Sequence, residues 1–131
     1  MDTKQDIGTR GDIESFVIEF YERVKKNEEI GIIFNEIVNI DWGHHIPLIT
    51  DFWETILLDN PVYRKNAMEK HFEVNRLIPL TRVHFDAWLG LFTGTIDDLF
   101  EGPVAELAKK RARSIADIML LKMNQANQSS L

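Results

Sequence analysis

The chain of 131 residues contains no cysteine, and this absence removes several kinds of chemistry at once. Disulfide bonds, thiolate catalysis, iron–sulfur clusters and zinc sites built on cysteine are all excluded. The chain also lacks an apolar run of membrane-spanning length. Its first residues are polar and do not form the apolar centre of a signal peptide. We therefore expect a soluble, cytoplasmic protein with no membrane partner.

Basic residues are too few and too scattered to form a nucleic-acid surface. Lysine and arginine number 15 against 21 aspartates and glutamates, which gives a formal net charge of −6. One dense basic run, residues 109–113, is typical of an exposed helix turn. We expect no nucleic-acid partner, because phosphate binding requires a basic face.

Length and composition predict one globular domain over residues 1–131. Hydrophobic residues make up 44% of the chain, which is ordinary for a protein with a substantial core. Residues 1–11 and 124–131 are polar, and we expect them to be frayed termini. The sequence contains no internal repeat.

The spacing of apolar residues predicts helices throughout and an all-α fold. In the first helix, Asp12 is the expected N-cap, and residues 25–27 end the helix. One apolar stripe follows the helical period: Ile13, Phe16, Val17, Phe20, Tyr21 and Val24. Residues 28–39 are predicted to form short turns that direct Ile32, Ile33 and Phe34 inward.

Four further helices are expected after these turns. The next helix begins at Gly43 or at Pro47 and ends at residue 58. A short helix then carries Met68, His71 and Phe72. A long helix follows with Thr81 as its cap, and the last helix starts after Gly102 and Pro103, because proline suits a first helical turn.

The four histidines do not form a recognisable metal site. The neighbours His44 and His45 point roughly 100° apart on a helix, so they cannot easily share one metal. Paired Glu-x-x-His segments for a di-iron site are absent, and no serine lies in a nucleophile turn. Singly, His71, Tyr21 and Trp88 are ordinary helix residues. Together, one imidazole and two aromatic donors are what a haem with a polar ligand side requires.

Five motifs follow one another between residues 16 and 123. They are Phe20-Tyr21-Glu22-Arg23-Val24, Gly31-Ile32-Ile33-Phe34, Trp42-Gly43-His44-His45 with Phe52-Trp53, Glu69-Lys70-His71-Phe72, and Phe85-Asp86-Ala87-Trp88-Leu89-Gly90-Leu91-Phe92. Together, in this order and spacing, they resemble the truncated haemoglobins, most closely their third group. The glycine pairs of the first two groups are absent, as they are in the third group.

The resemblance implies a two-over-two helical sandwich that binds haem b, with His71 as the iron ligand. Tyr21, Trp88 and His45 are then the catalytic distal residues. The expected haem contacts are Phe34, Ile49, Phe52, Trp53, Met68, Phe72, Phe85 and Leu89. Arg76 is expected to bind a propionate, with Arg64 and Lys70 as alternatives.

Pro47 lies two residues after His45, which bears on the distal side of this expected site. Proline disfavours helical geometry in the residue before it. His45 is therefore expected to lie before the helix proper and to swing toward solvent as a gate. His44 is the alternative residue for the same place.

The resemblance also implies a function. Oxygen, carbon monoxide and nitric oxide are the expected ligands, and two distal donors would slow oxygen release by roughly 10- to 10³-fold. We expect redox chemistry, such as nitric oxide dioxygenase or peroxidase-like activity with an electron-donating reductase, and not oxygen transport. The alternatives are a haem-free globin-like sensor or interaction domain and a plain helical bundle.

Overall fold

The computed structural model describes residues 4–37, 40–63 and 67–129, and within these ranges the chain is helical without a strand. The all-α prediction is confirmed. The helices are α1 (Arg10–Lys26), α2 (Trp42–Leu57), α3 (Ala67–Leu77), α4 (Arg82–Leu99) and α5 (Pro103–Ser129), with a π-helical turn η1 (Ile33–Ile37). None of the described helices is long and apolar enough to cross a membrane.

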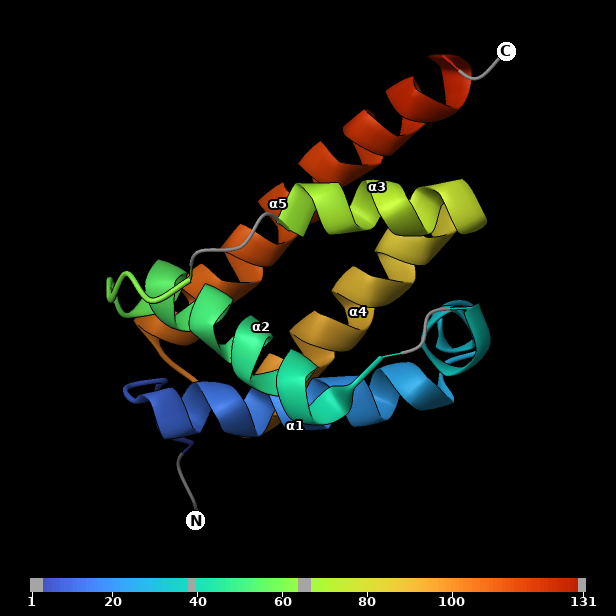
Figure 1. The fold of residues 1–131 in the computed structure, drawn as a ribbon. Helices are drawn as coiled ribbons and strands as arrows, with labels where there is room; N and C mark the ends of the chain where they lie inside the picture. The colour runs from blue at the N-terminus through green and yellow to red at the C-terminus, as the bar shows by residue number, and fades with distance from the viewer. Residues whose placement is uncertain (1–3, 38–39, 64–66, 130–131) are drawn as a thin grey trace.

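The helices pack in crossing layers, with α2, α3 and α4 arranged around the centre of the molecule and α1 crossing behind α2 and α4 along one side (Figure 1). Helix α1 packs against both α2 and α4, and α4 packs along α5. Helix α3 lies across α5 at the other end of the molecule. All six apolar residues of the predicted α1 stripe are buried. Phe16 anchors this core with its ring edge-on to Phe92, at 5.6 Å between ring centroids.

Helix α1 begins at a capping box and not at Asp12. The Thr9 hydroxyl oxygen accepts the Asp12 backbone N–H at 3.1 Å, and the Asp12 carboxylate accepts the Thr9 N–H at 3.1 Å. The prediction of Asp12 as N-cap is wrong, because this aspartate is the reciprocal partner three residues inside the helix. The predicted cap Thr81 is confirmed, and its N–H donates to His84 Nδ1 at 3.0 Å.

The first described residues are held against the start of α5, which differs from the expected frayed terminus. Ile7 is buried, and the Asp6 carboxylate accepts the backbone N–H groups of Val104 and Ala105 at 2.9 and 2.8 Å. These two N–H groups have no acceptor inside the helix, so Asp6 satisfies them from a distant part of the chain.

Gly102 allows this approach. Its φ of +144° lies in the left-handed region, and an added Cβ would lie 2.5 Å from Asp6 Cγ.

The far end of α5 is also tied to its neighbour. The helix continues to Ser129, past the polar segment that was expected to fray. Asn75 on α3 donates from Nδ2 to Asn127 Oδ1 at 2.9 Å and accepts the Leu80 N–H on Oδ1 at 2.7 Å. One buried amide thus joins α3, α5 and the turn before α4.

Helix α2 begins at Trp42 with Asp41 as its N-cap residue, so Pro47 lies inside the helix. The prediction that His45 precedes the helix is wrong. The His45 N–H already donates to the Asp41 carbonyl at 2.8 Å. The N–H that Pro47 lacks would bond only the carbonyl of Gly43, so the helix loses one hydrogen bond near its start and continues.

The turns before α2 also differ in one residue from the expectation. Ile33 is buried and Phe34 is half-buried against the core, but Ile32 is 47% exposed. Neighbouring side chains of a helical turn point in different directions, so three consecutive residues cannot all face inward.

Candidate functional site

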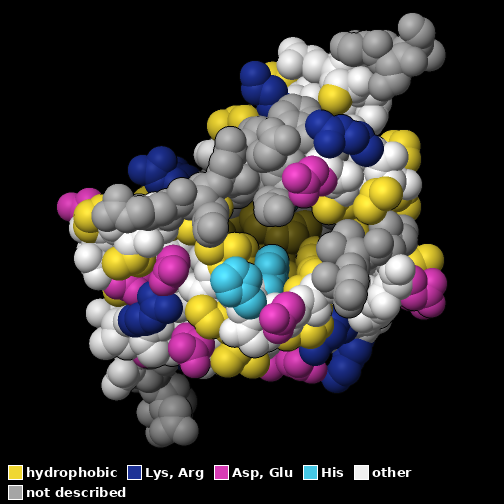
Figure 2. Space-filling model, in the orientation of Figure 1, with side chains coloured by type: hydrophobic (Ala, Val, Ile, Leu, Met, Phe, Trp, Pro, Cys, Tyr) yellow, Lys and Arg dark blue, Asp and Glu magenta, His cyan; other side chains and the backbone are white. Residues whose placement is uncertain are grey.

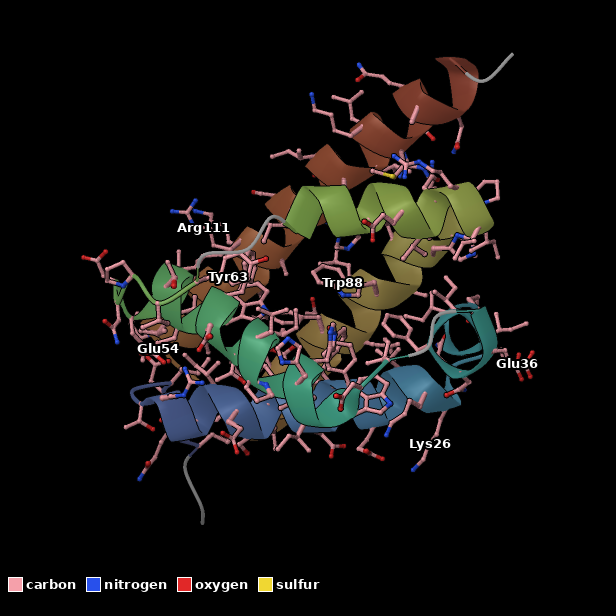
Figure 3. The ribbon with its side chains drawn as sticks, viewed as in Figure 1. Lys26, Glu36, Glu54, Tyr63, Trp88 and Arg111 are labelled. Carbon is pink, nitrogen blue, oxygen red and sulfur yellow. The ribbon has the colours of Figure 1, made fainter. Side chains whose placement is uncertain are left out.

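A hollow opens on the face of the molecule between α2, α3 and α4. In Figure 2 its floor is formed by hydrophobic side chains, and histidine side chains lie on its rim. Figure 3 shows Trp88 on α4 directed into the same region. The hollow is therefore apolar with a small number of polar groups, which is the usual character of a cofactor or ligand site.

Tyr21 and His45 form a hydrogen-bonded pair at this site. The Tyr21 hydroxyl oxygen and His45 Nε2 are 3.1 Å apart, and the residues come from α1 and α2. Burial raises the pKa of the Tyr21 phenol, which is only 7% exposed. Its hydroxyl therefore keeps its proton throughout the physiological range and remains a hydrogen-bond donor.

The imidazole of His45 is held in its neutral form. Burial lowers the pKa of His45 below its ordinary value of 6.5, and the charges of His44 and His71 lower it further. A neutral imidazole has one donor and one acceptor nitrogen, so the hydrogen bond with Tyr21 can run in either direction.

An aromatic cluster fixes the ring of Tyr21. Its centroid lies 5.2 Å from that of Trp42 and 5.8 Å from that of Phe34, and Trp42 lies 5.6 Å from the His45 ring. The ammonium of Lys25 lies 4.9 Å over the Trp42 ring. The cluster joins α1, η1 and α2 at one edge of the hollow.

Trp42 is the residue of this cluster that sequence reasoning missed. It lies three residues before His45, which places the two side chains on the same face once the helix begins at Trp42. The signal was present but required the correct start of α2.

Trp88 is supported from beneath by phenylalanines. Its ring stacks on Phe92 at 5.6 Å between centroids, with an interplanar angle of 17°, and Phe20 meets it edge-on at 5.9 Å. The half-buried indole is thus held on α4 with its edge available to the hollow.

His71 lies half-buried on α3. Its charge contributes to the lowered pKa of His45, so the two imidazoles lie within electrostatic range of each other although they come from different helices. The structure therefore brings together all four predicted distal and ligand residues, Tyr21, His45, His71 and Trp88, around one region.

The predicted cofactor contacts fall into groups. Phe34, Ile49 and Phe52 are half-buried and pack against the core. Trp53 and Phe85 are buried at 3% and 8% exposure, and Arg76 is exposed near the end of α3. The side chains of Met68 and Phe72, together with the alternatives Arg64 and Lys70, lie outside the described residues.

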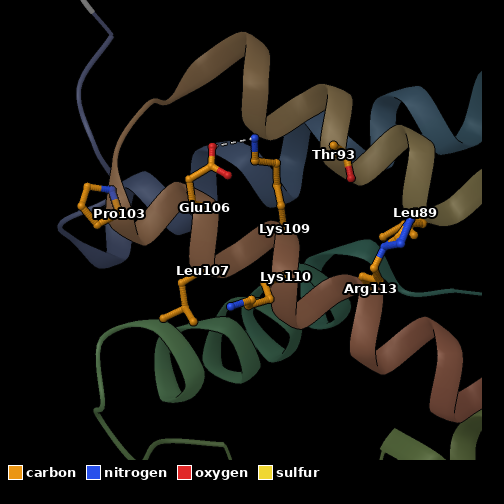
Figure 4. A pocket seen from close by; sticks show the side chains of 8 residues that line it. All are labelled: Leu89, Thr93, Pro103, Glu106, Leu107, Lys109, Lys110 and Arg113. Carbon is orange, nitrogen blue, oxygen red and sulfur yellow. Dashed lines mark ion pairs between the residues drawn. The ribbon is translucent and has the colours of Figure 1, made fainter.

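A second cavity of about 670 Å³ lies along α4 and α5 (Figure 4). Leu89, a predicted cofactor contact, borders this cavity, and Lys109 at its edge pairs with Glu106 at 2.9 Å. Its other lining residues are Thr93, Pro103, Leu107, Lys110 and Arg113.

No group of three or more potential ligands that could hold a bare metal ion occurs among the residues that the structure describes. A haem differs from such a site, because its porphyrin supplies four ligands and the protein needs to supply only one.

Comparisons with known proteins identify related chains. A group 3 truncated haemoglobin of Campylobacter jejuni is 30% identical over 100 residues, which are 74% of this chain and 76% of that protein. The crystal structure of a group III truncated haemoglobin from Campylobacter jejuni matches with a TM-score of 0.79 and 27% identity, over 92% of this chain and 95% of that chain. No family model matches the sequence.

Proposed function

Because the chain belongs to the group 3 truncated haemoglobins, and is therefore a haem-binding globin of a family that binds diatomic gases, we propose that it carries haem b on His71 and uses it for redox chemistry. The observation that carries the proposal is the set of four residues around one apolar hollow. His71 comes from α3, and the Tyr21–His45 pair and Trp88 come from three other helices.

The described residues fit a haem. The hollow has an apolar floor, which suits the flat porphyrin, and histidines at its rim, which suit an iron. His71 would hold the iron through an imidazole nitrogen, and the exposed cation of Arg76, five residues further along α3, would be available to a propionate. When bound, the haem would supply an iron that can bind a diatomic ligand or peroxide and exchange electrons.

Tyr21 and Trp88 are the two donors for such a ligand. Each hydrogen bond to a ligand that carries negative charge is worth about 1–3 kcal/mol. Since about 1.4 kcal/mol corresponds to a factor of ten, each donor alone slows release of the ligand by roughly 5- to 150-fold. Slow release favours reaction of the ligand over its delivery elsewhere.

His45 positions the Tyr21 hydroxyl. In the tautomer that carries its proton on Nε2, His45 donates to the Tyr21 oxygen and leaves the phenolic proton free for the ligand. The lowered pKa of His45 keeps it neutral, so it adds no fixed positive charge beside the ligand.

The reactions that suit this arrangement are nitric oxide dioxygenation and peroxide reduction. Both consume electrons. We assign the electron for nitric oxide dioxygenation to an electron-donating reductase in the cytoplasm, and peroxide reduction can draw its electrons from the same reductase or from a small reductant. In both, the protein's own contribution is electrostatic, from donors fixed in advance where negative charge develops.

The function is tested by mixing the reduced, haem-loaded protein in aerated buffer with nitric oxide and measuring nitrate. We expect nitrate in proportion to the nitric oxide consumed, and release of oxygen that is slow compared with this reaction. Fast oxygen release without nitrate formation or peroxide consumption would indicate a carrier and contradict the redox proposal. A chain that takes up no haem b, measured by the pyridine haemochrome spectrum, would support the haem-free alternative.

A further inference from the structure

A continuous series of aromatic rings runs from Trp88, at the hollow, to Tyr63, in the segment after α2. Trp88 stacks on Phe92 at 5.6 Å, and Phe92 stacks on Trp53 at 4.7 Å with an interplanar angle of 25°. Trp53 meets Phe52 at 5.3 Å, and Phe52 meets Tyr63 at 5.2 Å. Figure 3 labels both ends of this series, which we call the aromatic relay.

The relay alternates in chemistry along its length. Indole and phenol rings lose an electron far more easily than a phenyl ring does. Trp88, Trp53 and Tyr63 are therefore the sites that can hold an oxidising equivalent, and one phenylalanine separates each from the next. The interior of the relay is sealed, because Trp53 is 3% exposed and Phe92 is 1% exposed. A reagent in solution cannot reach Trp53 directly.

Tyr63 is the end that solvent can reach. It is half-buried, and its backbone N–H donates to Thr55 Oγ1 on α2 at 3.0 Å, which fixes it one turn from Phe52. Its phenol can therefore exchange an electron with Trp53, across the ring of Phe52, and with small molecules in solvent.

We propose that the aromatic relay carries oxidising equivalents from the hollow to Tyr63 when hydrogen peroxide is reduced at the site, so that the protein oxidises small reductants such as ascorbate at its surface. This inference rests on the proposed haem function. It adds a second place, away from the hollow, at which a substrate reacts.

The electrons and protons balance in this scheme. Hydrogen peroxide accepts two electrons and two protons, its O–O bond breaks, and two water molecules form. Each electron passes from Tyr63 through the relay to the hollow. Tyr63 releases its phenolic proton to solvent at the same time, so a neutral phenoxyl radical forms. Ascorbate monoanion then returns one electron and one proton to Tyr63. Two ascorbates, each oxidised to its radical anion, restore the protein for every peroxide consumed.

The test locates the radical directly. Haem-loaded protein is mixed with hydrogen peroxide and 2-methyl-2-nitrosopropane, a nitroso spin trap, and the adducts are assigned by peptide mass spectrometry. We expect an adduct on Tyr63, expressed per peroxide consumed, and its loss in Tyr63→Phe. His84→Gln, a variant at a residue outside the hollow and the relay, is the control, and it should keep the Tyr63 adduct per peroxide consumed.

A variant that interrupts the middle of the relay distinguishes oxidation of Tyr63 through the relay from direct oxidation of Tyr63 by a reagent in solution. Trp53→Phe keeps a ring against Phe92 but removes the oxidisable indole, and we expect at least a tenfold loss of Tyr63 adduct while the Soret band persists. An unchanged adduct in Trp53→Phe, or its absence from Tyr63 in the unmodified protein despite peroxide consumption, would overturn the relay. If Trp53→Phe loses its helical circular dichroism, Trp88→Phe, which removes the oxidisable indole at the start of the relay, gives the same comparison per peroxide consumed. A missing Soret band would contradict the haem proposal instead.

Discussion

The pairing of Tyr21 with His45 shows how burial sets the chemistry of single residues in this protein. Burial raises the pKa of the phenol and lowers that of the imidazole, so each group is driven to its neutral form. Two neutral partners at 3.1 Å share one hydrogen bond whose direction is free to change. The Tyr21 hydroxyl can therefore give up its proton's hydrogen bond to His45 and donate to a ligand in the hollow without creating a buried charge.

Removing the Tyr21 hydroxyl should accelerate oxygen release. Tyr21→Phe loses one donor worth about 1–3 kcal/mol toward a ligand that carries negative charge, so we expect release to be roughly 5- to 150-fold faster. Stopped-flow kinetics measures this rate. Carbon monoxide, which carries much less charge, is the control ligand, and its release should change by less than about threefold. Equal effects on both gases would mean that the variant changes the shape of the site and not its hydrogen bonding.

His45 should make the stability of the protein depend on pH. Its folded pKa lies below the ordinary 6.5, so the unfolded chain binds the proton more readily. The free energy of unfolding is therefore highest above about pH 6.5 and decreases as the pH falls toward the folded pKa. Burial also lowers the pKa of His84, which adds a contribution of the same sign.

Urea unfolding between about pH 7 and pH 5 measures this dependence. We expect a smaller decrease in His45→Gln than in the unmodified protein, and a smaller decrease again when His84→Gln is added. Glutamine at position 84 can keep the capping box of α4, so this second variant removes an imidazole without removing the cap. A His45→Gln protein with the full pH dependence would contradict the assignment.

At the scale of the helices, the apolar period predicted the elements, and the capping residues predicted the beginnings of α4 and α5 but not that of α1. The α1 stripe from Ile13 to Val24 is buried as expected, because the period of a helix alone decides which residues share a face. The start of α2 at Trp42 and the capping of α5 by Asp6 were not predicted. Asp6 acts 98 residues away from Val104 along the chain, and no local pattern encodes such a contact.

In the candidate site, too, some features could be predicted from local sequence and others depend on how the helices pack. Tyr21, Trp88 and His71 could be identified from short motifs, because each is fixed by its neighbours in the sequence. The aromatic relay could not, because the contact of Trp53 on α2 with Phe92 on α4 depends on how these two helices cross. Trp53 was expected to contact the cofactor. In the structure it is buried in the core between α1, α2 and α4, where its ring contacts Phe16 and Phe92.

The junction before α5 offers a sharp test of the fold. Gly102→Ala places a Cβ 2.5 Å from Asp6 Cγ at a φ of +144°, and we expect a loss of about 1–3 kcal/mol in the free energy of unfolding. Gly90→Ala is the matched variant on α4, with no atom within 4 Å of the new Cβ, and should gain about 0.5–1 kcal/mol. Thermal or urea unfolding measures both. A tolerated Gly102→Ala would mean that the N-terminal segment does not dock as described.

For the whole molecule, the arrangement of helices around a hollow links folding to cofactor binding. A ligand that binds the folded chain and not the unfolded chain stabilises it, by about 2.7 kcal/mol at a free concentration one hundred times its dissociation constant. We expect hemin to raise the midpoint of thermal unfolding, and His71→Ala to lose most of this gain. Protoporphyrin IX without iron is the control, because its effect should be the same in both proteins. An equal gain from hemin in His71→Ala would mean that this histidine does not hold the iron.

The visible absorption spectrum of the reduced, hemin-loaded protein with and without carbon monoxide tests the assignment of His71 most directly. We expect a Soret band that sharpens and shifts with carbon monoxide in the unmodified protein and in His84→Gln, and a lost or altered band in His71→Ala. Identical spectra in His71→Ala and the unmodified protein would contradict the assignment of His71 as the ligand, and no Soret band in any of the three would contradict the haem site itself.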